Sequence, residues 1–252
     1  VDFYIEKNDP VKALQVVDFA ISQHPYATVF LIKQAHLYIL TNNNEKAFIA
    51  LQKAELLEPS EPDIYLLRGN IFQNTERFDE ALENYEKALG LAESTDEILL
   101  QMAYVYQSMS DYESAITYIK LSLEQNMENQ DGLYELAFCY DVLDKQEESI
   151  KFYQQYIDTD PYSYAAWYNL GNSFHKLNLF EKAIDAYDYA ILIKEDFSSA
   201  YFNKGNALVQ LDKYDEAIEV YKHTFEYEQP NADTYCAIGE CYEKLEQMDE
   251  AR

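Results

Sequence analysis

The sequence is poor in basic residues, and this shortage excludes several classes of partner. Its 252 residues contain 19 Lys and Arg against 46 Asp and Glu, which gives a formal net charge of −27 at pH 7. A surface this acidic repels phosphate groups and anionic lipid, so we expect neither nucleic acid nor a membrane surface as a partner. No apolar run approaches the roughly 18 residues that a membrane-spanning helix needs.

Cysteine, glycine and proline are also scarce. Three cysteines, an odd number spread along the chain, argue against a disulfide framework and favour a reducing compartment, which we expect to be the cytoplasm. The periplasm stays open, because the chain begins with Val1, as a fragment would, and the lack of a signal peptide then carries no information. Six glycines, six prolines and 48% hydrophobic residues favour helices around a sizeable core.

The few glycines are regularly placed. Gly171, Gly205 and Gly239 are 34 residues apart, and Gly69 lies three such periods before Gly171. A second column of small residues follows the same period: Ala13, Ala47, Ala81, Ala115, Ser149, Ala183 and Ala217. A column of large residues lies between them: Tyr4, Tyr38, Phe72, Tyr106, Tyr140, Phe174, Leu208 and Tyr242. No insertion or deletion breaks the register, so the whole chain is a tandem repeat.

Each repeat has the pattern of two short antiparallel helices. Apolar residues recur with a period of 3.6 in both halves, and small residues at matching heights let two helix backbones approach while aromatic side chains fill the space around them. Pro25, Pro59 and Pro161 mark the ends of second helices, and Ser94 with Glu97 predicts a capping box at the start of a first helix. The sequence therefore predicts an all-α fold of antiparallel helix pairs.

This pattern resembles the tetratricopeptide repeat (TPR) family. Residues 164–197 supply the residues that the family pattern requires, apart from Glu195 in place of a proline: Trp167, Leu170, Gly171, Phe174, Ala183, Tyr187 and Ala190. The resemblance implies a right-handed α-solenoid superhelix that forms a single array over residues 1–252. Its expected units are a partial repeat 1–27, full repeats 28–61, 62–95, 96–129, 130–163, 164–197 and 198–231, and a partial repeat 232–252.

Patterns that carry catalysis are not found in the sequence. It contains no phosphate-binding glycine loop, no paired-histidine zinc motif and no cysteine pair at ligand spacing. The four histidines lie in four different repeats. We expect no enzyme, no cofactor and no metal site.

The resemblance also implies where a partner binds, because the first helices of TPR pairs line a concave groove. Apolar residues in one groove column, among them Tyr134, Tyr168 and Phe202, mark an interaction surface if they are exposed, and otherwise pack between helices. Asparagines in neighbouring columns could bind a peptide backbone or only link the repeats. Acids such as Asp131 favour a basic ligand, or only complement the helix dipole. No base occupies the column that a clamp for C-terminal carboxylates would need.

These observations predict a non-catalytic protein–protein interaction scaffold that binds a neutral or basic peptide or protein segment in its groove. The candidate residues are Asp131, Tyr134, Phe138, Tyr168, Asn169, Asn172, His175, Phe202, Asn203 and Asn206. The alternative is a substrate-recruiting or regulatory arm of a larger enzyme or sensor, with catalysis beyond Arg252, where the chain stops in mid-repeat. We also expect homodimers through the truncated array ends, where Tyr235, Ile238 and Tyr242 lack a covering helix.

Overall fold

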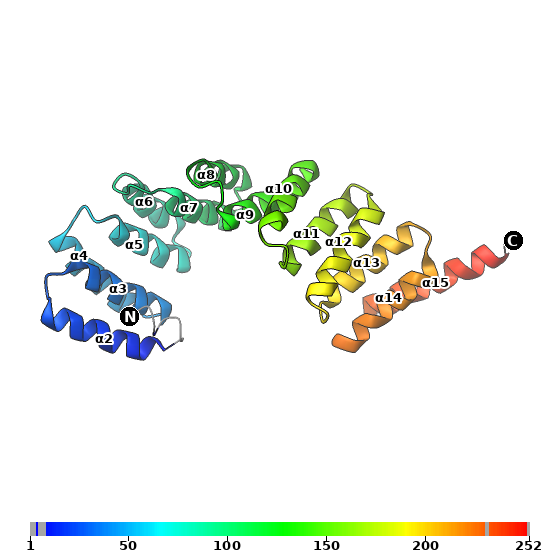
Figure 1. The fold of residues 1–252 in the computed structure, drawn as a ribbon, viewed down its shortest axis with the longest axis horizontal. Helices are drawn as coiled ribbons and strands as arrows, with labels where there is room; N and C mark the ends of the chain where they lie inside the picture. Colours follow the sequence, from blue (N-terminus) through cyan, green and yellow to red (C-terminus); the bar gives the residue numbers. More distant parts are fainter. Residues whose placement is uncertain (1–3, 5–8, 230–231, 251–252) are drawn as a thin grey trace. The chain divides into compact units, whose positions relative to one another are not determined.

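A computed structural model gives the structure of Tyr4, residues 9–229 and residues 232–250, the last four by their backbone alone. Val1 and Arg252, as well as residues 2–3, 5–8, 230–231 and 251, lie outside the described residues. The described part contains 14 helices and divides into two compact units, residues 1–127 and 128–252, which are described separately here (Figure 1). The expectation of one uninterrupted array with the repeat boundaries given above stays a prediction.

The first unit holds seven helices: α2 (Pro10–Gln23), α3 (Thr28–Leu40), α4 (Asn44–Leu57), α5 (Pro62–Asn74), α6 (Phe78–Leu89), α7 (Asp96–Ser108) and α8 (Tyr112–Gln125). The second unit holds seven more: α9 (Gln130–Val142), α10 (Gln146–Thr159), α11 (Tyr164–Lys176), α12 (Phe180–Ile193), α13 (Ser198–Gln210), α14 (Tyr214–Tyr227) and α15 (Ala232–Glu250). From α3 onward, each odd-numbered first helix begins 34 residues after the one before it. The predicted all-α fold of helix pairs and its period are confirmed.

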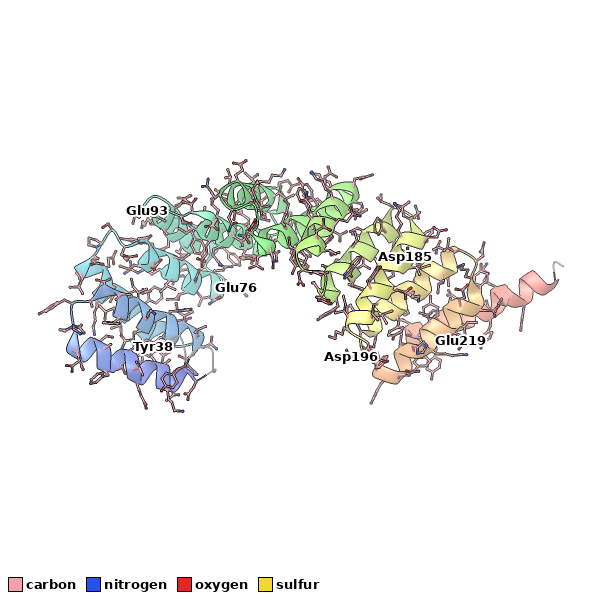
Figure 2. The ribbon with its side chains drawn as sticks, viewed as in Figure 1. Tyr38, Glu76, Glu93, Asp185, Asp196 and Glu219 are labelled. Atoms are coloured by element: carbon pink, nitrogen blue, oxygen red, sulfur yellow. The ribbon has the colours of Figure 1, made fainter. Side chains whose placement is uncertain are left out.

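The turn inside each pair uses one residue in the left-handed region of the backbone. These residues also recur every 34 positions: Asn42, Glu76, Ser110, Asp144, Asn178 and Asp212. Figure 2 shows one of them, Glu76, with a φ of 58°, where α5 gives way to α6. Asparagine and aspartate tolerate this conformation, whereas glutamate and serine are strained in it, so packing of the paired helices must hold the turn at Glu76 and Ser110.

Glycine recurs in the first helices because a tyrosine ring of the second helix lies directly against it. A Cβ added to Gly171 would come within 2.5 Å of the Tyr187 ring, and the same overlap arises between Gly205 and Tyr221. Both rings are 1% exposed. The contact replaces backbone hydration with close packing of an aromatic ring, so the second helix is fixed against the first at this height.

Two local features differ from the sequence predictions. The capping box at Ser94 and Glu97 is wrong, because α7 begins one residue later, with Thr95 at its N-cap, and the Ser94 hydroxyl donates to the Asp96 carboxylate at 2.9 Å. In addition, α15 runs for 19 residues, whereas every other first helix has 13. Its sequence is rich in helix-forming residues, and α14 of the preceding pair packs against it, but no later helix among the described residues packs beside it to impose a turn.

Candidate functional site

All ten candidate groove residues lie on first helices of the second unit. Asp131, Tyr134 and Phe138 are on α9; Tyr168, Asn169, Asn172 and His175 are on α11; and Phe202, Asn203 and Asn206 are on α13. The 34-residue period sets residues of one column at the same height on successive helices. The structure thus brings residues that are up to 75 positions apart in the sequence onto one side of the helix stack.

The aromatic column is only half exposed. Tyr134 packs its edge against Tyr153, with the ring centroids 5.6 Å apart. Tyr168 meets Tyr187 at 5.9 Å, and Phe202 meets Tyr221 at 5.5 Å. The earlier member Leu100 is 5% exposed. The column is therefore largely an inter-helix packing element rather than an open apolar stripe, which is the second of the two interpretations that the sequence allowed.

The asparagines form ladders from one repeat to the next. Asn169 Nδ2 donates to Tyr134 Oη at 2.8 Å, and Asn203 Nδ2 donates to Tyr168 Oη at 3.0 Å and to Asn172 Oδ1 at 2.9 Å. Both amide hydrogens of Asn203 are used in this way. Asn169 and Asn203 thus link repeats, as the structural interpretation predicted.

Asn172 and Asn206 keep unused hydrogen-bonding groups. Their Oδ1 atoms accept from the buried Tyr187 and Tyr221 hydroxyls at 2.9 and 2.7 Å. These bonds fix the orientation of each amide. Neither Nδ2 group donates to another described residue, so each amide offers donors from a fixed position.

These two asparagines line a pocket of about 240 Å³, here called the amide pocket. It is lined by Asp141, Asn172, His175, Lys176, Tyr187, Asn203 and Asn206. Lys176 Nζ is 3.1 Å from Asp141 Oδ1, so the single base of this pocket is neutralised by its acid. The amide pocket is therefore nearly uncharged and rich in hydrogen-bonding groups.

A second pocket of about 340 Å³ adjoins the amide pocket, because His175 and Asn206 line both. This terminal pocket is lined by His175, Asn206, Val209, Gln210, Tyr214, Tyr221, Ala237, Glu240, Cys241 and Lys244. Gln210 and Glu240 are exposed at its edge. The two adjoining pockets are together called the hollow here, and their walls are a mixture of apolar and polar residues.

His175 lies at the junction of the two pockets and is partly buried. Burial lowers the pKa of its imidazole, because removing water penalises the charged form. Its Nε2 is buried without a hydrogen-bond partner among the described residues, and its ring meets Phe180 edge-on, with the ring centroids 5.3 Å apart. The ring is therefore held neutral near pH 7, and a ligand that fills the hollow could supply the missing partner.

The candidate residues do not all meet in one place. Tyr168, Phe202 and Asn203 line a smaller pocket of about 220 Å³ together with Glu228 and Asp233. Asp131, Tyr134 and Phe138 line none of these three pockets. Phe138 is 37% exposed, and Asp131 is exposed in the first turn of α9, where an acid suits the helix dipole.

Two sets of pocket-lining residues are absent from the ten candidates. Asp141, Lys176 and Gln210 line the amide and terminal pockets, and their positions in the groove columns already mark them as groove residues. A separate pocket of about 470 Å³ lies on the side of the second helices and is lined in part by Trp167 and Tyr189. No column rule points to that pocket, because its walls come from α10, α11 and α12.

Metal binding and membrane insertion find no structural support in the described part of the chain. Among the residues described, no three His, Cys, Asp or Glu side chains gather in a geometry that would hold a metal ion. Within the same residues, no helix combines the length and apolar character needed to cross a bilayer.

The repeats match known sequence families. Residues 62–95, 96–127, 131–162 and 164–197 match families described as Tetratricopeptide repeat, and residues 205–246 match one described as TPR repeat. Among curated proteins, no sequence matches the chain.

Solved structures resemble the chain along much of its length. The MamA protein is 27% identical, with a TM-score of 0.64 over 67% of this chain and 92% of MamA. YrrB, described as a TPR protein with an unusual peptide-binding site, is 24% identical, with a TM-score of 0.60 over 73% of this chain and 95% of YrrB. The C-terminal part of a TPR repeat-containing protein from Cytophaga hutchinsonii is 12% identical, with a TM-score of 0.77 over 94% of this chain and 97% of that one.

Proposed function

Because the chain belongs to the tetratricopeptide repeat family, whose members mediate protein–protein interactions, we propose that it is a non-catalytic scaffold that binds an extended peptide segment. The proposed binding surface is the hollow formed by the amide pocket and the terminal pocket. Family members are typically non-catalytic, and the scarcity of cysteine fits action in the cytoplasm.

The observation that carries this proposal is the pair of oriented amides on successive first helices. Asn172 and Asn206 are held by tyrosine hydroxyls and present free Nδ2 donors at the same height on α11 and α13. An extended backbone offers carbonyl acceptors at regular intervals, so two fixed donors can bind it whatever its side chains are. Donors fixed in advance also lose little side-chain entropy when the peptide binds.

The charges around the hollow favour a neutral or basic ligand. Lys176 is paired with Asp141, and Glu240 and Lys244, one turn apart on α15, both line the terminal pocket. The neighbouring smaller pocket adds Glu228 and Asp233 without a base. Since the whole chain carries a formal charge of −27, an acidic peptide would meet unfavourable potential at every stage of its approach.

A selection from a random peptide library tests this proposal with variants that block the hollow and leave the hydrogen bonds of Asn169 and Asn203 between repeats intact. Gln210→Arg and Glu240→Lys place bulk and positive charge at the terminal pocket, and both positions are exposed. The control variant Gln155→Arg/Glu148→Lys makes the same chemical changes on exposed positions of α10. We expect the wild type and the control to enrich the same neutral or basic peptides, and the blocking variant to lose them.

Truncating the aromatic column would be a poor test, because Tyr168 and Phe202 pack against Tyr187 and Tyr221. Their removal would loosen the array as well as any binding surface. Equal enrichment by all three proteins in the library selection would instead contradict the proposal, since it would move binding away from the hollow.

A further inference from the structure

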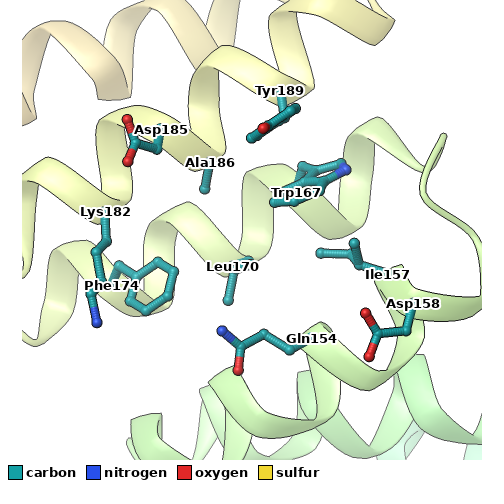
Figure 3. Close-up of a pocket in the computed structure, with 10 residues that line it drawn as sticks. All are labelled: Gln154, Ile157, Asp158, Trp167, Leu170, Phe174, Lys182, Asp185, Ala186 and Tyr189. Carbon is teal, nitrogen blue, oxygen red and sulfur yellow. The ribbon is translucent and has the colours of Figure 1, made fainter.

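We propose that the pocket on the side of the second helices, here called the tryptophan pocket, is a second docking site that takes an arginine side chain of a partner protein. It has a volume of about 470 Å³, and its walls come from α10, α11 and α12 (Figure 3). None of its residues lines the hollow of the proposed function, so this inference does not depend on that function.

The floor of the tryptophan pocket is apolar and tightly held. Ile157, Leu170, Phe174 and Ala186 are each at most 8% exposed, and Figure 3 shows Leu170 near the centre of the pocket. Such a floor suits the three methylene groups of an arginine, which bury well against apolar surface while the head group stays near water.

Two stacked aromatic rings form one wall. The Trp167 and Tyr189 rings lie 4.4 Å apart between centroids at an angle of 23°, and Trp167 Nε1 donates to the Pro161 carbonyl oxygen at 3.0 Å. This hydrogen bond fixes the indole even though Tyr189 is 50% exposed. A rigid, partly exposed aromatic pair is a surface on which a planar guanidinium stacks favourably, more so than an ammonium group.

Two carboxylates complete the site. Asp158 and Asp185 are exposed, and Figure 3 shows them on opposite sides of the pocket with Leu170 between them. Neither carboxylate is paired with a base among the described residues. Among the described residues that line the pocket, Lys182 is the one base, and its Nζ is 5.6 Å from the centre of the Phe174 ring. The unpaired acids favour a cationic head group over a neutral or anionic one.

A titration with the tripeptide acetyl-Gly-Arg-Gly-amide tests this proposal on the full chain. The chain contains a single tryptophan, so the indole fluorescence and the indole ¹H–¹⁵N signal both report on this pocket alone. The same tripeptide with citrulline in place of arginine keeps the shape and removes the charge. We expect the arginine peptide to shift both signals and to bind about fivefold more tightly than the citrulline peptide, as an exposed ion pair allows.

A charge-matched pair of variants separates this site from general attraction to an acidic protein. Asp158→Asn/Asp185→Asn removes two charges at the pocket, and Glu195→Gln/Asp196→Asn removes two exposed charges outside it. We expect about fivefold weaker binding of the arginine peptide to the first variant and unchanged binding to the second. The proposal is overturned if the indole does not respond to the arginine peptide, if citrulline binds equally well, or if both variants weaken binding alike.

Discussion

At the scale of single residues, the repeat is defined by pairs of positions that fit each other. Gly171 and Gly205 face the Tyr187 and Tyr221 rings, and the hydroxyls of those rings bind the asparagine next to each glycine. Where the small residue is alanine, the facing position holds Leu51 opposite Ala35 and Ile119 opposite Ala103, but Tyr153 opposite Ala137. The same 34-residue unit therefore exists in glycine–tyrosine and alanine–aliphatic forms and, once among the described repeats, in an alanine–tyrosine form.

Gly171→Ala should destabilise the chain by about 1–3 kcal/mol, because the new methyl group overlaps the Tyr187 ring and forces the two helices apart. The double variant Gly171→Ala/Tyr187→Leu recreates the alanine–aliphatic form and should recover part of this loss. Urea unfolding followed by circular dichroism measures both. A double variant less stable than Gly171→Ala would show that steric fit is not the reason for the glycine.

His175 should make the stability depend on pH. Burial lowers its pKa in the folded chain below the usual value of 6.5, so below that pH the unfolded chain binds a proton that the folded chain does not. The stability gained from a folded state with a neutral imidazole is fully present above about pH 6.5, and it is lost progressively as the pH falls below that value. Urea unfolding at several pH values should therefore show a larger loss of stability on acidification for wild type than for His175→Asn. Equal losses would contradict a buried neutral imidazole.

These contacts explain which site residues can be predicted from the sequence and which cannot. Asn172, His175 and Asn206, which the columns place on neighbouring helices, line one pocket, because a fixed period places equal positions at equal heights. The columns placed Asn203 and Asn206 apart but could not tell which column donates between repeats and which keeps its donors free. That difference depends on whether a tyrosine hydroxyl of the preceding repeat comes within reach.

At the scale of the helix, the second helices differ in how they begin. Asp111 caps α8 by accepting from the Ser114 backbone N–H at 3.1 Å, and Asn43 caps α4 in the same manner. The equivalent positions of α10 and α14, Lys145 and Lys213, make no side-chain cap. The sequence columns predict where these helices begin, but not which of them are capped.

Lys145→Asp should stabilise the chain by about 1 kcal/mol, since it supplies a cap and places a carboxylate at the positive end of the helix dipole. Lys145 is exposed, so the change disturbs no packing. Conversely, Asp111→Ala removes the existing cap of α8 and should destabilise the chain by about 1 kcal/mol. A thermal or urea unfolding series on both variants tests this, and a Lys145→Asp variant that is no more stable than wild type would contradict it.

At the scale of the whole molecule, the 34-residue period predicted the all-α fold and the pairing of its helices, since both follow from side-chain size at fixed intervals. The length of α15 and the tryptophan pocket could not be predicted in this way. The length of α15 depends on whether a neighbouring helix packs against it and imposes a turn. The tryptophan pocket depends on how the side chains of three helices leave a space between them.

Helix α15 presents a surface that favours self-association. Helix α15 exposes Tyr235 and Tyr242 to 58% and 51%, and aromatic side chains of this size are favourable at an interface between two copies. We expect the mass measured by light scattering to rise with concentration, and to stay that of a monomer for Tyr235→Ser/Tyr242→Ser. A constant monomer mass of the wild type across the whole dilution series would contradict this expectation.

A peptide that binds in the hollow between the first helices should perturb the residues that line it, and the position of a bound peptide can be measured. A peptide without arginine, taken from the library selection, would be added to ¹⁵N-labelled protein while the side-chain amide signals are followed. We expect the Nδ2 signals of Asn172 and Asn206 to shift on binding while the Trp167 indole signal stays in place. Binding that leaves both asparagine signals unchanged would contradict a site in the hollow.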